Sequence, residues 1–90
     1  MIIKKHLVIL GKVQGVGFRY WMQNLAVNNN ISGWVKNKLS GDVEALIIVQ
    51  EKEVQKLIKQ CKIGPSSSTI QNIQINDYDQ DYPKEGFNIF

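Results

Sequence analysis

The stretch GKVQGVGFRY, residues 11–20, joins a strand pattern to a helix pattern through a short loop that contains two glycines. Residues 7–10 before it are all apolar, as in a buried strand, and from Phe18 onward the apolar residues recur at helical spacing. Gly15 and Gly17 adopt positive φ at little cost, so the loop can turn its backbone N–H groups toward one point. The first turn of the helix directs its own unpaired N–H groups to that point. The stretch therefore predicts a strand–loop–helix unit that holds a tetrahedral anion.

The residue that follows this loop supports the same prediction. The chain has 11 basic residues, and Arg19 is its only arginine. A guanidinium is planar and permanently charged, and it binds a phosphate through two parallel hydrogen bonds, which a lysine ammonium cannot do. The position of Arg19, two residues after Gly17, favours phosphate binding over an ordinary surface ion pair.

Outward from this unit, the hydrophobic pattern predicts an α+β, ferredoxin-like fold of the split βαβ type (βαββαβ). Its antiparallel sheet has four to five strands and carries two helices on one face, with the first and third strands in the centre. Ile70 is out of phase with Ile73 and Ile75, which predicts a β-bulge in the last long strand. The expected strands are residues 6–13, 33–38, 43–49 and 69–76 with a short one at 87–89, and the helices run from 18 to near 28–30 and from 51 to 62.

Composition narrows the class of protein. Ninety residues, 43% of them hydrophobic, predict one domain that spans residues 1–90. The single cysteine, Cys61, excludes an internal disulfide and fits a reducing compartment, and no stretch is long enough to cross a membrane. The net charge of +3 comes from dispersed lysines, which favours a solvated surface over a nucleic-acid patch. We therefore expect a cytoplasmic protein with neither a membrane nor a nucleic acid as partner.

A second motif, GWVKN at residues 33–37, places Asn37 on the strand to which the first helix leads. Such a strand can return beside the glycine loop, and an amide there has the donor and the acceptor needed to orient one water molecule. Asn37 could equally be a turn former at the end of a strand. An arginine, a ring of N–H groups and a water-holding amide together make a minimal phosphoryl-transfer site. With one histidine and one cysteine, no metal cluster can be assembled from those residue types.

With these motifs in order, the chain resembles the acylphosphatase family from about His6 to Ile89. The resemblance rests on GKVQGVGFR at residues 11–19, GWVKN at 33–37, GDVE at 41–44 and Gly64-Pro65. It implies hydrolysis of a small-molecule acyl phosphate to a carboxylate and inorganic phosphate, with no metal and no cofactor, and we expect a monomer. It also implies that Arg19 binds the phosphate, that Asn37 positions the attacking water, and that the N–H cradle is formed by Gln14, Gly15, Val16, Gly17, Phe18 and Arg19.

Some positions depart from common patterns of that family. Lys12 stands where arginine is frequent, the run Asn28-Asn29-Asn30 replaces a helix end that usually contains glycine, and Ser68 replaces an alanine. These changes concern packing and capping rather than the chemistry. No conventional base accompanies the motifs, so the hypothesis is that a phosphate oxygen of the substrate takes the proton of the water.

Other functions for the same fold remain open at this point. A non-catalytic ferredoxin-like module could bind RNA or a small ligand such as an amino acid. RNA readers of this architecture place aromatic residues on the central strands, and residues 6–13 and 43–49 contain none. An acylphosphatase-like domain of a hydrogenase-maturation carbamoyltransferase is a further possibility, and the length of the chain favours the free-standing enzyme.

Overall fold

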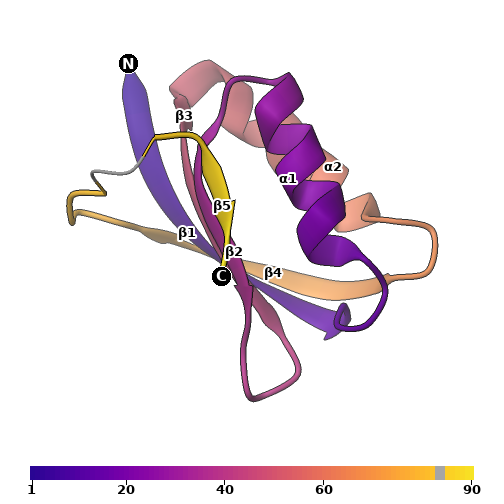
Figure 1. Ribbon diagram of the computed structural model, residues 1–90. Coiled ribbons are helices and arrows are strands. Elements are labelled where there is room, and N and C mark those ends of the chain that lie inside the picture. Colours follow the sequence, from indigo (N-terminus) through magenta and orange to yellow (C-terminus); the bar gives the residue numbers. More distant parts are fainter. Residues whose placement is uncertain (83–84) are drawn as a thin grey trace.

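The computed structural model describes residues 1–82 and 85–90, and its five strands form one sheet in the order β4-β1-β3-β2-β5. Neighbouring strands are antiparallel except for β2 and β5, which are parallel. Both helices lie across the same face of this sheet (Figure 1). The elements are β1 (Ile2–Lys12), α1 (Phe18–Asn28), β2 (Ser32–Asn37), β3 (Val43–Gln50), the 3-10 turn η1 (Glu51–Glu53), α2 (Val54–Ile63), β4 (Thr69–Asp77) and β5 (Phe87–Ile89). The predicted fold class and the central position of the first and third strands are confirmed.

The core lies between the helices and the covered face of the sheet. The helical stripe predicted from Phe18 is present, since Phe18, Met22 and Ala26 are buried and Leu25 packs against them. Burying a large apolar side chain stabilises a fold by about 1.5–3 kcal/mol, so these contacts hold α1 on the sheet. The other helix contributes a matching stripe, and the sheet contributes alternate residues of its strands. The core residues of α2 are Val54, Leu57, Ile58 and Cys61, and those of the central strands include Leu7, Ile9, Val43, Ala45 and Ile47.

The predicted bulge occurs in β4. The pairing of β1 with β4 shifts between Leu10 and Gly11, which face Asn72 and Ile70, so Gln71 is the extra residue. Because side chains alternate along a strand, one extra residue returns Ile70 to the covered face that Ile73 already occupies. Ile70 accordingly packs against the core.

Two boundaries differ from the sequence prediction by three or more residues, for physical reasons that lie outside the local pattern, and the others agree to within one or two residues. β1 begins at Ile2 rather than at residue 6, because its backbone pairs with β3 as far as Ile2 and Gln50 despite the lysines in between. The second helix was expected from residue 51, but residues 51–53 form a 3-10 turn and the α-helix begins at Val54. Neither helix of the described residues has the length and apolar composition needed to cross a membrane.

Candidate anion-binding site

The loop between β1 and α1 has the backbone conformation that its two glycines allow. Gly15 has φ 72° and Gly17 has φ 79°, both in the left-handed region. A Cβ atom built on either glycine meets nothing within 4 Å, so a side chain would have room there. Glycine is needed at these positions because of the positive φ. The Gly17 carbonyl accepts the first helical hydrogen bond, from Trp21 N at 3.0 Å. The loop therefore runs directly into the N-terminus of α1, where the helix dipole favours an anion.

The apolar side chains of the loop anchor it to the core. Phe18 is buried, Val16 packs against the same cluster, and the Phe18 ring lies 5.4 Å from the Trp21 ring between centroids. Within residues 1–82 and 85–90, the backbone N–H groups of residues 15–17 donate to no protein acceptor. Those N–H groups thus stay available for an external anion while the side chains hold the loop in place.

Arg19 lies in the first turn of α1, beside the end of β5. Its Nη1 donates to the backbone carbonyl of Phe90 at 3.4 Å, which is long for a hydrogen bond. The Phe90 N–H donates to the Val35 carbonyl at 2.9 Å, and Val35 pairs with Ile89 of β5. The guanidinium is therefore close to β2, near the end of the strand that carries Asn37. No sequence pattern indicated that the end of the chain lies beside Arg19.

Asn37 is the last residue of β2 and is exposed. It pairs with Val43 of β3 across the neck of the β2–β3 hairpin. The side chain of Gln14 connects this hairpin to the glycine loop, because Gln14 Nε2 donates to the Lys38 carbonyl at 2.7 Å and to the Asp42 carbonyl at 2.8 Å. The structure thus brings Gln14, Arg19 and Asn37 to one end of the sheet. The sequence assigned only the backbone N–H of Gln14, and the role of its side chain was missed.

The titratable groups singled out in the sequence lie elsewhere. His6 is on the open face of the sheet, where its Nε2 lies 2.9 Å from Glu44 Oε2. Cys61 is buried in α2, and burial raises the pKa of its thiol to about 12, which makes it a poor nucleophile. The described residues contain no group of three or more His, Cys, Asp or Glu that could hold a metal ion.

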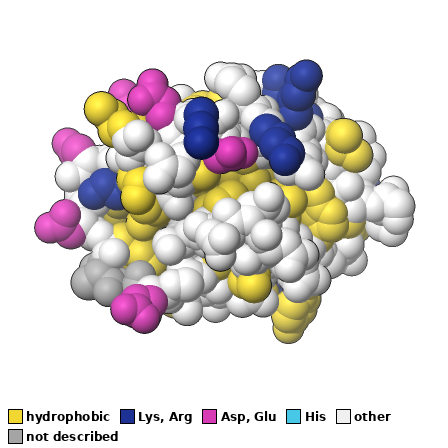
Figure 2. All heavy atoms as spheres, turned by 90° about the horizontal axis from the view of Figure 1, so that it is seen from above, with side chains coloured by type: hydrophobic (Ala, Val, Ile, Leu, Met, Phe, Trp, Pro, Cys, Tyr) yellow, Lys and Arg dark blue, Asp and Glu magenta, His cyan; other side chains and the backbone are white. Residues whose placement is uncertain are grey.

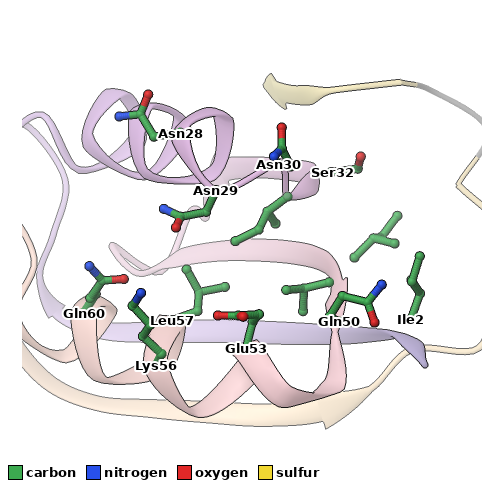
Figure 3. A pocket seen from close by; sticks show the side chains of 13 residues that line it. Ile2, Asn28, Asn29, Asn30, Ser32, Gln50, Glu53, Lys56, Leu57 and Gln60 are labelled. Carbon is green, nitrogen blue, oxygen red and sulfur yellow. The ribbon is translucent and has the colours of Figure 1, made fainter.

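An open pocket of about 580 Å³ lies at the opposite end of α1 from the glycine loop. Figure 3 shows Asn28, Asn29 and Asn30 on one side of it and the side chains of Glu53, from η1, and Lys56, from α2, on the other. Figure 2 looks down on this end of the molecule, where hydrophobic side chains form the floor of a hollow with lysines and an acidic group at one edge. With 11 residues, α1 is roughly 16 Å long, which separates the pocket from the loop.

Two polar side chains of that pocket have partners in the chain. Asn29 Nδ2 donates to the Leu25 carbonyl at 2.7 Å and closes the end of α1, and Gln50 Oε1 accepts from the Met1 amino group at 3.3 Å. The Asn28-Asn29-Asn30 run therefore contributes to capping, as its departure from the family pattern indicated. The geometry that can hold an anion is at the other end, in the loop.

Comparison with known proteins shows which family and which solved structures the chain is similar to. A family model described as Acylphosphatase matches residues 5–89. The chain is 34% identical over 90 residues to Acylphosphatase of Rhodopseudomonas palustris (strain BisB5), and the match covers 94% of this chain and 91% of that protein. It superposes on the crystal structure of acylphosphatase from Bacillus subtilis with TM-score 0.90 and 32% identity, covering 100% of this chain and 99% of that chain. Full-length HypF, in a phosphate- and nucleotide-bound crystal structure, matches with TM-score 0.86 and 32% identity, but only 12% of that chain is covered.

Proposed function

This chain belongs to the acylphosphatase family, and on that premise we propose that its glycine loop holds the phosphate of an acyl phosphate while Asn37 directs the attacking water. The enzyme hydrolyses the carboxyl–phosphate bond and releases a carboxylate and inorganic phosphate. The observation that carries the proposal is the loop itself. Two positive-φ glycines lead into the N-terminus of α1, and the only arginine of the chain is in the first helical turn.

The loop and Arg19 act on the charge of the transferring phosphoryl group. In phosphoryl transfer this charge spreads over three equatorial oxygens, and fixed N–H groups and a guanidinium stabilise it without reorganising during the reaction. The N–H groups of Gln14, Gly15, Val16, Gly17, Phe18 and Arg19 supply the cradle, and Arg19 adds a bidentate charge. Removing one preorganised donor of this kind lowers kcat by about 10²–10³-fold.

Asn37 has the complementary role at the water. Its amide oxygen accepts a hydrogen bond from the water and its amide nitrogen donates to a phosphate oxygen, which places the water in line with the departing carboxylate. A carboxylate leaves without protonation, so the reaction needs no general acid. Residues 13–19 contain no His, Asp or Glu, so the proton of the water passes to a phosphate oxygen. One P–O bond forms to water and one P–O bond breaks to the carboxylate. The phosphate keeps both protons of the water, so the products are the carboxylate and dihydrogen phosphate, which then gives up a proton to solvent.

We propose that the chain works as a single domain over residues 1–90, as a cytoplasmic monomer that needs neither metal nor cofactor. The match covers 91% of the Rhodopseudomonas palustris relative but only 12% of full-length HypF, so the similarity to HypF is confined to one part of it. The central strands β1 and β3 have no Phe, Tyr or Trp, and the His6 ring of β1 is held by Glu44, which disfavours base stacking and hence RNA as the ligand.

Hydrolysis of benzoyl phosphate in the presence of a chelator tests the proposal. We expect wild-type activity to be unaffected by the chelator, and Arg19→Ala and Asn37→Ala each to lose at least about 10²-fold in kcat/KM. Phosphate should inhibit competitively, and Arg19→Ala should weaken that inhibition more than Asn37→Ala does.

Two control variants show whether the loss of activity comes from the site itself or from removing any positive charge or any amide. Lys59→Ala removes an exposed cation from α2, and Asn24→Ala removes an exposed amide from α1, and both should keep wild-type kinetics. Equal weakening of phosphate inhibition in Arg19→Ala and Asn37→Ala would show that the assigned division of roles is wrong. An inactive wild type would reject the function itself.

A further inference from the structure

The carboxamide of Gln14 makes two short hydrogen bonds to one small part of the chain. Its Nε2 donates to the Lys38 carbonyl at 2.7 Å and to the Asp42 carbonyl at 2.8 Å, across 24 and 28 residues of sequence. An amide nitrogen has two N–H donors, so both are used here. The side chain is half-buried, and it points away from the phosphate cradle toward the hairpin.

Lys38 and Asp42 are the two residues at the neck of the β2–β3 hairpin. The Lys38 N–H donates to the Asp42 carbonyl at 2.8 Å, and the Gly41 N–H donates to the Lys38 carbonyl at 3.2 Å. The next pair inward is Asn37 with Val43. Gln14 therefore binds both sides of the hairpin one residue away from Asn37.

Next to Lys38 and Asp42, the sheet makes few other contacts that could hold the hairpin in place. The pairing of β1 with β3 ends at Ile9 and Val43, so the hairpin projects beyond that ladder. Leu39, at the tip of the hairpin, is 110% exposed and packs against nothing that would fix the turn. The side chain of Gln14 thus continues the connection between β1 and the hairpin after the backbone ladder has ended.

From this geometry we propose that Gln14 is a positioning residue, whose side chain sets the separation between the N–H cradle and the water-directing amide of Asn37. The inference rests on the proposed function, since it assigns what the Gln14 carboxamide does for that same site. Glutamine suits the task because the two carbonyls need two donors from one point. A glutamate would present oxygens to those carbonyls, and an asparagine is one methylene shorter.

The predicted signature is a loss in kcat with little loss in phosphate affinity. Without the Gln14 side chain, the loop N–H groups and Arg19 still bind phosphate, but Asn37 is no longer held at a fixed distance from it. A misplacement of about 1 Å in a reacting geometry costs roughly 10²-fold in rate. Gln14→Met, which keeps the length and removes the donors, should lower kcat by about 10–100-fold and change the inhibition constant of phosphate by less than about threefold.

A double-mutant cycle distinguishes positioning from a merely structural role. If Gln14 acts through Asn37, Gln14→Met should lower kcat by less than about threefold when Asn37 is already alanine. Gln14→Glu should behave like Gln14→Met or worse. Gln23→Met is the matched control, because Gln23 Nε2 donates to a backbone carbonyl of β5, that of Phe87 at 3.0 Å, away from the hairpin. It should leave kcat within about twofold of wild type even where urea unfolding shows a loss of stability.

A second readout does not depend on activity. Backbone amide exchange and relaxation of residues 38–42, measured by NMR, should show a more mobile hairpin in Gln14→Met and an unchanged one in Gln23→Met. Additive effects of Gln14→Met and Asn37→Ala on kcat, or a hairpin that is equally rigid without Gln14, would overturn the inference. If wild type fails to hydrolyse benzoyl phosphate but Gln14→Met still mobilises the hairpin, the proposed function fails while the structural connection stands.

Discussion

Glu44 is a half-buried carboxylate on the open face of the sheet, and its charge is balanced by two neighbours. Its Oε2 lies 2.9 Å from His6 Nε2 and its Oε1 lies 3.4 Å from Lys36 Nζ, with 18% of the side chain exposed. Burial by itself raises the pKa of Glu44, but the hydrogen bonds and positive charges of His6 and Lys36 outweigh it, so the pKa is lowered overall.

The lowered pKa of Glu44 predicts a specific dependence of stability on pH. Because the carboxyl ionises more readily in the folded state, its stabilisation is complete above the ordinary glutamate pKa of about 4.3 and is lost as the pH falls through the folded-state value. Urea unfolding should therefore show wild type more stable than Glu44→Gln near pH 6, with the difference shrinking below about pH 4. Glu51→Gln, an exposed control in η1, should follow the wild-type curve. A difference that widens as the pH falls would contradict the assigned sign.

At this scale, local chemistry could be predicted from the sequence and long-range pairing could not. The positive φ of Gly15 and Gly17 and the place of Arg19 follow from ten consecutive residues, so the motif contains them. The second role of Gln14 depends on carbonyls 24 and 28 residues later. A contact of that kind forms only after the fold has brought the hairpin beside the loop, and no local pattern encodes it.

At the scale of elements, the pairing of β2 with β3 leaves no room for a side chain at one glycine of β2. Gly33 has φ 138°, and a Cβ there would be placed directly against the Leu46 carbonyl of β3, whose backbone is fixed by the sheet. Gly41, in the hairpin turn, also has a positive φ, 98°, but a Cβ there meets nothing within 4 Å. In the same hairpin, Gly33 is therefore required for lack of space, whereas Gly41 is required only for its backbone conformation.

Alanine at these two glycines should have very different effects on stability. Gly41→Ala carries only the conformational penalty of a left-handed residue, about 1–2 kcal/mol. Gly33→Ala must in addition force β2 away from β3, so we expect a loss well beyond that of Gly41→Ala or failure to fold. Chemical denaturation of both variants, followed by circular dichroism, measures the comparison. Equal losses would show that β2 can move to accept the methyl group.

The elements were predictable to the extent that periodicity alone defines them. The phase break at Ile70 correctly indicated the bulge, because an extra residue reverses the alternation of a strand wherever it occurs. The start of β1 was missed because Lys4 and Lys5 obscure the apolar pattern, while the backbone pairing with β3 continues to Ile2. The 3-10 turn at residues 51–53 was missed because the charged residues of η1 fit an α-helix equally well.

For the whole molecule, the thiol of Cys61 reports on opening of the core. It is fully buried on α2 among residues contributed by both helices and the sheet, and burial raises its pKa to about 12. Leu57 and Ile58 of the same helix belong to the same cluster, so α2 cannot leave without exposing the core. Reaction with a disulfide reagent should therefore be slow in native protein and increase with urea in parallel with global unfolding. Rapid reaction without denaturant would indicate that α2 detaches separately.

Phosphate bound in the loop should stabilise the entire fold by mass action. A ligand that binds only the folded state adds RT ln(1 + [L]/Kd), which is about 1.4 kcal/mol at roughly ten times Kd. For a domain of this size each kcal/mol corresponds to about 4–8 °C in Tm, so wild type should gain about 6–11 °C. The net charge of +3 offers a competing, non-specific route through dispersed lysines, and potassium chloride at equal ionic strength controls for it. Arg19→Ala keeps ten of the eleven basic residues and should lose most of the gain if the loop is the site. The same rise in chloride, or in Arg19→Ala, would assign the effect to the charged surface instead.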